Sequence, residues 1–67
     1  MGMDAVVKVL RAARLEQYIP VMDKQGYDDL DYLKALACNR TQFVEMSKAV
    51  LGMKPGHAMR LIEALSH

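Results

Sequence analysis

The segment Leu51–Leu65, LGMKPGHAMRLIEAL, constrains the fold more than any other part of this 67-residue chain. Gly52 can end a helix because glycine adopts a left-handed backbone at little steric cost. Pro55 can begin the next helix, since its missing N–H falls among donors that have no intrahelical partner. Apolar residues then recur at helical spacing, at Ala58, Leu61, Ile62 and Leu65. The segment predicts a helix, a turn and a final helix with one buried face.

Two helices are predicted before Gly26. The first, at about residues 4–13, has Asp4 as its N-cap. The second begins near Glu16, a start that tolerates Pro20 because the first four N–H groups need no intrahelical acceptor. Gly26 then ends it. The expected inward residues are Val6, Val7 and Leu10 in the first helix, and Leu15, Tyr18, Ile19 and Met22 around the second.

Two more helices are predicted between Gly26 and Gly52. Asp28 is the expected cap of a short third helix, with Tyr27 and Tyr32 packed together across its start. Asn39 and Gln42 have the spacing of a capping box, so the fourth helix is placed at about residues 40–51. The expected inward residues are Leu30, Leu33 and Leu36 in the third helix, and Phe43, Met46, Ser47 and Val50 in the fourth.

No run alternates apolar and polar residues in the manner of a strand, so the predicted fold class is all-α. We expect a compact five-helix bundle with a longer C-terminal helix, in a single domain over 1–67 whose core spans about 5–66. Residues 1–3 are expected to be a cloning scar or disordered. A domain of this size buries only about 60% of the surface of its unfolded chain, which predicts modest stability.

Composition excludes several classes of protein. The formal net charge is +1, which gives no strong field toward nucleic acid or membrane. No apolar run approaches the roughly 20 residues that cross a bilayer. A single cysteine, Cys38, forms no internal disulfide and suits a reducing, intracellular setting in the cytoplasm or nucleus. Gly2 is a poor myristoylation site, because Val6 stands where that motif has Ser or Thr.

The sequence offers no catalytic or metal-binding pattern. Cys38 has no neighbouring His, so we expect a buried small hydrophobe rather than a nucleophile. His57 and His67 lie ten residues apart, without cysteines or clustered carboxylates at ligand spacing. Gly52 and Gly56 have the wrong spacing for a phosphate loop. We therefore expect no enzyme activity, no cofactor and no metal.

Charge is distributed unevenly along the chain. Four Asp and one Lys between Asp23 and Asp31 give a local balance of −3. Three cations and no acid between Lys48 and Arg60 give +3. The aspartates can serve as helix caps and first-turn carboxylates, but the same groups can also face a partner. Lys54 has no such local purpose, because a helix N-terminus is already partly positive; it is either a solvated turn lysine or part of a site for acidic groups.

Three segments in order resemble a sterile alpha motif (SAM) domain over about residues 5–66. They are LEQYIPVM at 15–22, GYDDLDYLKAL at 26–36 and LGMKPGHAMRLIEAL at 51–65. The AMRL sequence at 58–61 is also similar to the polymer-forming SAM domains of Polycomb-type proteins. Two features depart from the family: Val6-Val7 stand where many members have tryptophan, and the fourth helix is longer than usual.

The resemblance implies a scaffold or signalling module that binds another SAM domain or a second copy of itself. One implied surface is the start of the last helix, with Lys54, Gly56, His57 and Arg60; Met59 beside it offers an apolar contact or fills the core edge. The other is an acidic mid-surface with Asp28, Asp29, Asp31 and Tyr32. Two complementary surfaces on one chain produce head-to-tail contacts.

An alternative function is binding of an RNA hairpin, which some SAM domains perform. A basic patch for it would form if the first and last helices lie side by side, from Lys8, Arg11, Arg14, Lys54 and Arg60. Five cations are few for binding that depends on phosphates, so protein association is the preferred hypothesis. We do not expect a lipid headgroup or a small-molecule substrate to bind.

Overall fold

Helices follow one another along residues 3–66, the part of the chain that the structure, a computed structural model, describes. The succession is α1 (Asp4–Ala12), the 3₁₀ turn η1 (Glu16–Tyr18), α2 (Ile19–Lys24), α3 (Leu30–Ala37), α4 (Arg40–Leu51) and α5 (Pro55–Leu65). No strand occurs among these residues, which confirms the all-α bundle. The last helix, α5, is longer than α1, α2 and α3, and α4 exceeds it by one residue.

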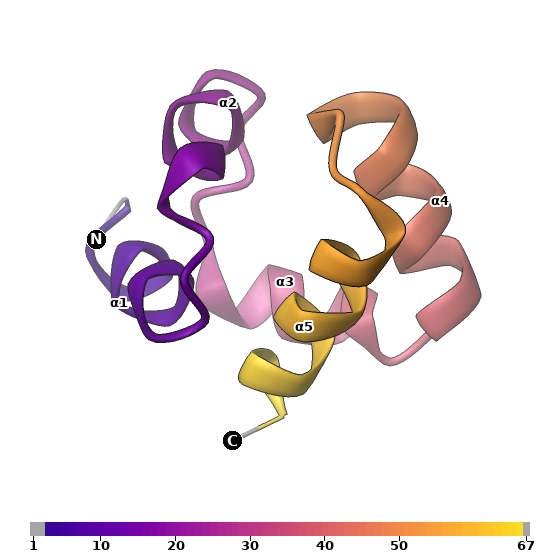
Figure 1. The fold of residues 1–67 in the computed structure, drawn as a ribbon. Helices are drawn as coiled ribbons and strands as arrows, with labels where there is room; N and C mark the ends of the chain where they lie inside the picture. Colours follow the sequence, from indigo (N-terminus) through magenta and orange to yellow (C-terminus); the bar gives the residue numbers. More distant parts are fainter. Residues whose placement is uncertain (1–2, 67) are drawn as a thin grey trace.

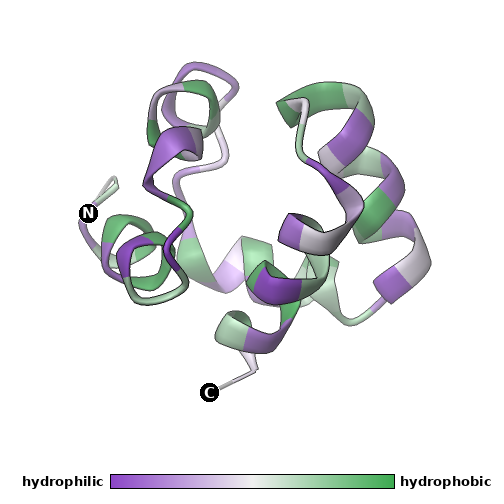
Figure 2. Ribbon diagram, in the orientation of Figure 1, coloured by the Kyte–Doolittle hydropathy of each residue, from purple (hydrophilic) through white to green (hydrophobic). Residues whose placement is uncertain are grey.

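The last helix occupies the middle of the fold (Figure 1) and packs against α1, α3 and α4. All four residues of its predicted stripe are buried: Ala58, Leu61, Ile62 and Leu65. They join a core contributed by every other helical segment, with Val6, Leu10, Ala13, Leu15, Tyr18, Met22, Leu33, Phe43, Leu51 and Met53. Along α4 and α5, hydrophobic and hydrophilic residues alternate as the chain winds (Figure 2), so each helix has an inner and an outer face.

Several predicted starts and stops are confirmed. Pro55 begins α5, and Gly52 ends α4 with a left-handed backbone, φ +63°. The amides of Gly52 and Met53 both donate to the Ser47 carbonyl, which satisfies an acceptor that the helix end leaves free. The Asn39 side chain caps α4 by accepting from the Gln42 amide.

Two predicted caps were wrong by one residue. Asp29, not Asp28, caps α3: its extended backbone lets Oδ1 accept from the amides of Asp31 at 2.9 Å and Tyr32 at 3.3 Å. The N-cap of α1 is Met3, so Asp4 lies inside the first turn and makes no cap hydrogen bond. A carboxylate at that position still interacts favourably with the helix dipole.

Two burial predictions were also wrong. Cys38 is exposed, because α3 ends at Ala37 and the thiol lies beyond the buried stripe; its Sγ contacts the Lys34 carbonyl at 3.6 Å. Val50 is 38% exposed, because the buried line of α4 runs every fourth residue through Phe43, Ser47 and Leu51. Val50 lies beside this line. Met46 is half-buried at its edge, and Met22 and Met53 are buried as predicted.

The end of α1 differs from the ends of α2 and α4, where glycine takes the left-handed conformation. Arg14 has φ +60°, a conformation that costs a residue with a Cβ roughly 1–2 kcal/mol. The chain reverses there because the Leu15 amide donates to the Leu10 carbonyl at 2.7 Å and the Leu15 side chain is fully buried. Packing of Leu15 therefore compensates for an unfavourable backbone at Arg14.

None of the helices among the described residues has the length and apolar character that a bilayer span needs.

Ser47 provides a test of the core. Its Oγ is fully buried and has no hydrogen-bond partner, and a buried unsatisfied hydroxyl costs about 1–3 kcal/mol. We expect Ser47→Ala to raise the free energy of unfolding by about 1 kcal/mol in urea denaturation. Ser66→Ala is the control, because the Ser66 Oγ donates to the Ile62 carbonyl at 3.0 Å and loss of that bonded hydroxyl should not raise the free energy of unfolding. A loss of stability in Ser47→Ala would contradict the assignment of an unsatisfied group.

Candidate protein interaction surfaces

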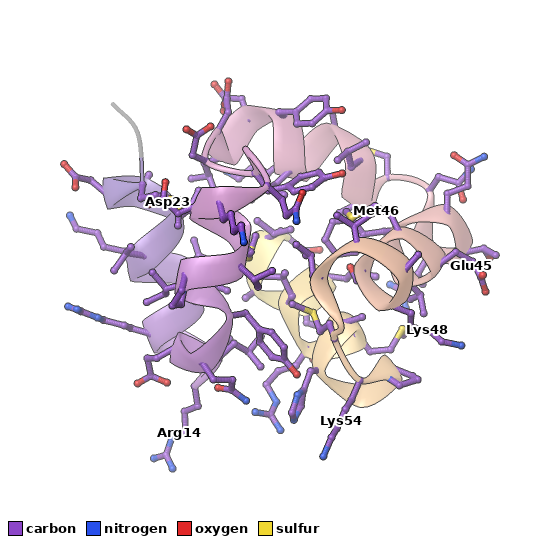
Figure 3. The ribbon with its side chains drawn as sticks, turned by 90° about the horizontal axis from the view of Figure 1, so that it is seen from above. Arg14, Asp23, Glu45, Met46, Lys48 and Lys54 are labelled. Carbon is purple, nitrogen blue, oxygen red and sulfur yellow. The ribbon has the colours of Figure 1, made fainter. Side chains whose placement is uncertain are left out.

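The start of α5 presents the residues predicted for one surface, which we call the basic tip: Lys54, Gly56, His57, Met59 and Arg60. Lys54 is the N-cap residue, has extended backbone and makes no side-chain cap bond, so its ammonium is free to point away from the body (Figure 3). Gly56 is exposed, and an added Cβ there would meet no atom within 4 Å. Met59 is 37% exposed. These three residues are accessible to a partner.

The other two residues of the basic tip are tied to the body of the domain. The Tyr18 hydroxyl lies 2.6 Å from His57 Nδ1, and the two rings meet edge to face with centroids 5.5 Å apart. The Arg60 guanidinium donates through Nη1 to the Ala13 carbonyl at 3.2 Å. His57 is half-buried, whereas Arg60 remains exposed. Both contacts hold the start of α5 against the segment that joins α1 to α2.

The second predicted surface, which we call the acidic surface, is formed by Asp28, Asp29, Asp31 and Tyr32. Asp29 and Asp31 are exposed and Asp28 is half-buried. The Tyr32 ring stacks on Tyr27 with centroids 6.4 Å apart, which confirms the predicted pair, and Tyr32 is still 52% exposed. Aspartates beside an exposed aromatic ring suit a partner that is both cationic and partly apolar.

The two surfaces belong to different sides of the domain. In Figure 3 the helix α3, whose start carries the acidic surface, lies at the edge opposite to the labelled Lys54. The principal extents of the domain are 27, 23 and 19 Å, against a screening length of about 8 Å at physiological ionic strength. The charges of one surface therefore do not neutralise those of the other, and both remain available to other molecules.

A groove of about 660 Å³ runs between α1 and α5; its lining residues are Lys8, Val9, Ala12, Ala13, Arg14, Arg60, Glu63 and Ala64. We call it the α1–α5 groove. It brings together three of the five cations predicted for an RNA-binding patch: Lys8, Arg14 and Arg60. Arg11 and Lys54 are not among its lining residues.

Sequence reasoning missed the contacts that position these residues. The pair Tyr18–His57 is separated by 39 positions and Arg60–Ala13 by 47, so no helical spacing rule could find them. The left-handed Arg14 was also missed, because no glycine or asparagine marks that turn. The apolar Leu15 just after α1 was the available signal, since a hydrophobic residue often follows such a helix end.

The described residues contain no group of three His, Cys, Asp or Glu side chains that could hold a metal ion. The exposed Cys38 has a single sulfur contact, to the Lys34 carbonyl, and no cationic partner is recorded for it among the hydrogen bonds of this part of the chain.

Comparisons with known proteins do not place the chain in a family. No family model, no curated protein and no solved structure gives a significant match.

Proposed function

We propose that this domain is a non-catalytic protein interaction module of the SAM type, in which the basic tip of one copy binds the acidic surface of the next. The observation that carries the proposal is the presence of two exposed surfaces of opposite charge on opposite sides of one small helical body. The sequence segments that resemble SAM domains contain all the residues of both surfaces.

The arrangement favours an open assembly. The basic tip and the acidic surface are different patches, so their contact leaves one free patch of each kind at the ends of a dimer. Further copies can add at both ends, and a helical filament forms unless the rotation between neighbours closes a ring. Opposite charges steer the encounter and fix the register, so the affinity should fall as salt concentration rises.

The same surfaces also allow pairing with a different SAM domain through one patch alone. Such pairing needs only Lys54, Gly56 and Arg60 on one side, or Asp29, Asp31 and Tyr32 on the other. The exposed free thiol of Cys38 suits the reducing conditions of the cytoplasm or nucleus, where we place the module.

Binding of an RNA hairpin is a second candidate, because Lys8, Arg14 and Arg60 line one groove. Two observations weaken it. Only three of the five predicted cations line the groove, since Arg11 and Lys54 lie outside it, and an RNA backbone would gain little from the apolar lining. Retention of a hairpin RNA on a filter at low salt would support this candidate, and the absence of retention would exclude it.

The first prediction concerns charge reversal on either surface. We expect Lys54→Glu and Asp31→Lys each to weaken self-association at least about tenfold, because each places like charges across the contact. Mixing the two variants should restore pairing, since each keeps the surface that the other lost. Asp31 is the better choice on the acidic surface, because Asp29 caps α3 and its replacement would also cost stability. Sedimentation velocity across protein and salt concentration measures the effect.

Matched controls for this experiment are Arg40→Glu and Asp23→Lys. They change charge by the same amounts at exposed positions on α4 and α2, outside both surfaces. We expect their assembly to resemble that of the wild type. A wild-type monomer at high protein concentration would exclude self-association and leave pairing with another SAM domain. Equal effects of the variants and their controls would contradict the proposed surfaces.

The second prediction concerns Gly56. Because a Cβ at this position meets nothing and the backbone is helical, we expect Gly56→Ala to raise the free energy of unfolding by about 0.4–1 kcal/mol. The same methyl group would obstruct the close approach of a partner backbone, so self-association should weaken. Urea denaturation and sedimentation of this one variant separate the two effects. Unchanged association would show that the partner does not approach Gly56 closely.

A further inference from the structure

The α1–α5 groove lies next to the basic tip and shares a residue with it. Arg60 belongs to the basic tip and also lines the groove. In Figure 3, Arg14 and Lys54 both extend from the same edge of the domain. Cations are therefore present both at the start of α5 and at the end of α1, over a wider area than the basic tip alone.

The chemistry of the groove is mixed. Val9, Ala12 and Ala64 line it with apolar groups, and Lys8, Arg14 and Arg60 contribute three positive charges against one negative charge from Glu63. Small side chains leave room for a bulky group to enter, and the cations favour acidic groups around it. A nucleic acid backbone would use the charges but gain little from the apolar part.

The acidic surface has the complementary composition. Its Tyr32 ring is 52% exposed, and Asp29 and Asp31 lie on either side of the start of the same helix. A tyrosine in an interface buries a large apolar area and loses little conformational entropy. The α1–α5 groove and the acidic surface thus each combine apolar groups with charged groups, and their charges have opposite signs.

Among the residues that line the groove, Arg14 has an unusual backbone conformation. Its backbone is left-handed, a conformation that favours glycine. Within the described part of the chain its side chain makes no hydrogen bond. The Arg14 side chain is exposed. Its guanidinium lies on the edge that also carries Lys54, where it is available to an acidic group of another molecule.

From these observations we infer that the α1–α5 groove receives the Asp28–Tyr32 segment of a second copy of this chain, with Tyr32 against the apolar lining and the aspartates facing Arg14 and Lys8. The inference rests on the proposed function and extends it, because it names a second part of the receiving surface and assigns Arg14 a direct role in binding.

The test replaces Arg14 by glycine, which fits the left-handed backbone and removes the charge. We expect Arg14→Gly to unfold at a temperature no lower than that of the wild type, while its self-association weakens about tenfold in sedimentation velocity. Arg14→Asn, which also tolerates this backbone, should give the same result. Arg14→Lys keeps the charge and should retain most of the association.

The control is Arg11→Gln, which removes one charge from an exposed position on α1 that does not line the groove. We expect it to change association less than about twofold. Equal effects of Arg14→Gly and Arg11→Gln would overturn the inference, because only net charge would then matter. If Lys54→Glu still disrupts assembly in that case, the proposed self-association stands; if it does not, the proposed surfaces are wrong as well. A wild-type monomer would overturn the inference and leave only pairing with another SAM domain.

The remaining outcome concerns RNA. If the wild type retains a hairpin RNA at low salt and Arg14→Gly loses the RNA but keeps its self-association, the groove binds nucleic acid and the inference is wrong. No retention of RNA, together with weaker assembly of Arg14→Gly, supports the inference.

Discussion

Burial of one face of α5 is the interaction on which the rest of the structure depends. Ala58, Leu61, Ile62 and Leu65 are almost completely removed from water, and α5 touches α1, α3 and α4 at once. The helices of this domain have 6 to 12 residues, and isolated helices of that length are marginal in water. Their stability therefore comes from the shared core, and α5 is the element through which most of them are joined.

The same packing places the polar groups that could bind a partner. Since the inner face of α5 is fixed in the core, its first turn points Lys54 and Gly56 outward, and the contacts of His57 with Tyr18 and of Arg60 with Ala13 secure that turn. An interaction surface held in this way is organised before binding, so little conformational entropy is lost when a partner arrives.

Much of this fold could be predicted from the sequence, because its signals are local. Gly52 and Pro55 mark a turn by backbone geometry, and the stripe of α5 follows from helical spacing. The sequence does not distinguish Asp28 from Asp29 as the cap of α3, because adjacent aspartates offer the same chemistry. The burial of Cys38 and Val50 depends on where neighbouring helices lie. The sequence predicts which residues form the two candidate surfaces. It does not predict the groove or the left-handed backbone of Arg14, because both depend on packing in the folded domain.

The exposed position of Cys38 has a practical consequence for the study of this domain. Its thiol follows α3 and is open to oxidants, so two copies can become linked by a disulfide once reducing agent is exhausted. The disulfide-linked product has the mass of a dimer and persists at any salt concentration, whereas a contact between opposite charges dissociates as the salt concentration rises. The same isolated thiol accepts a maleimide dye at one defined position, which allows a fluorescence reporter to be attached without engineering a new cysteine.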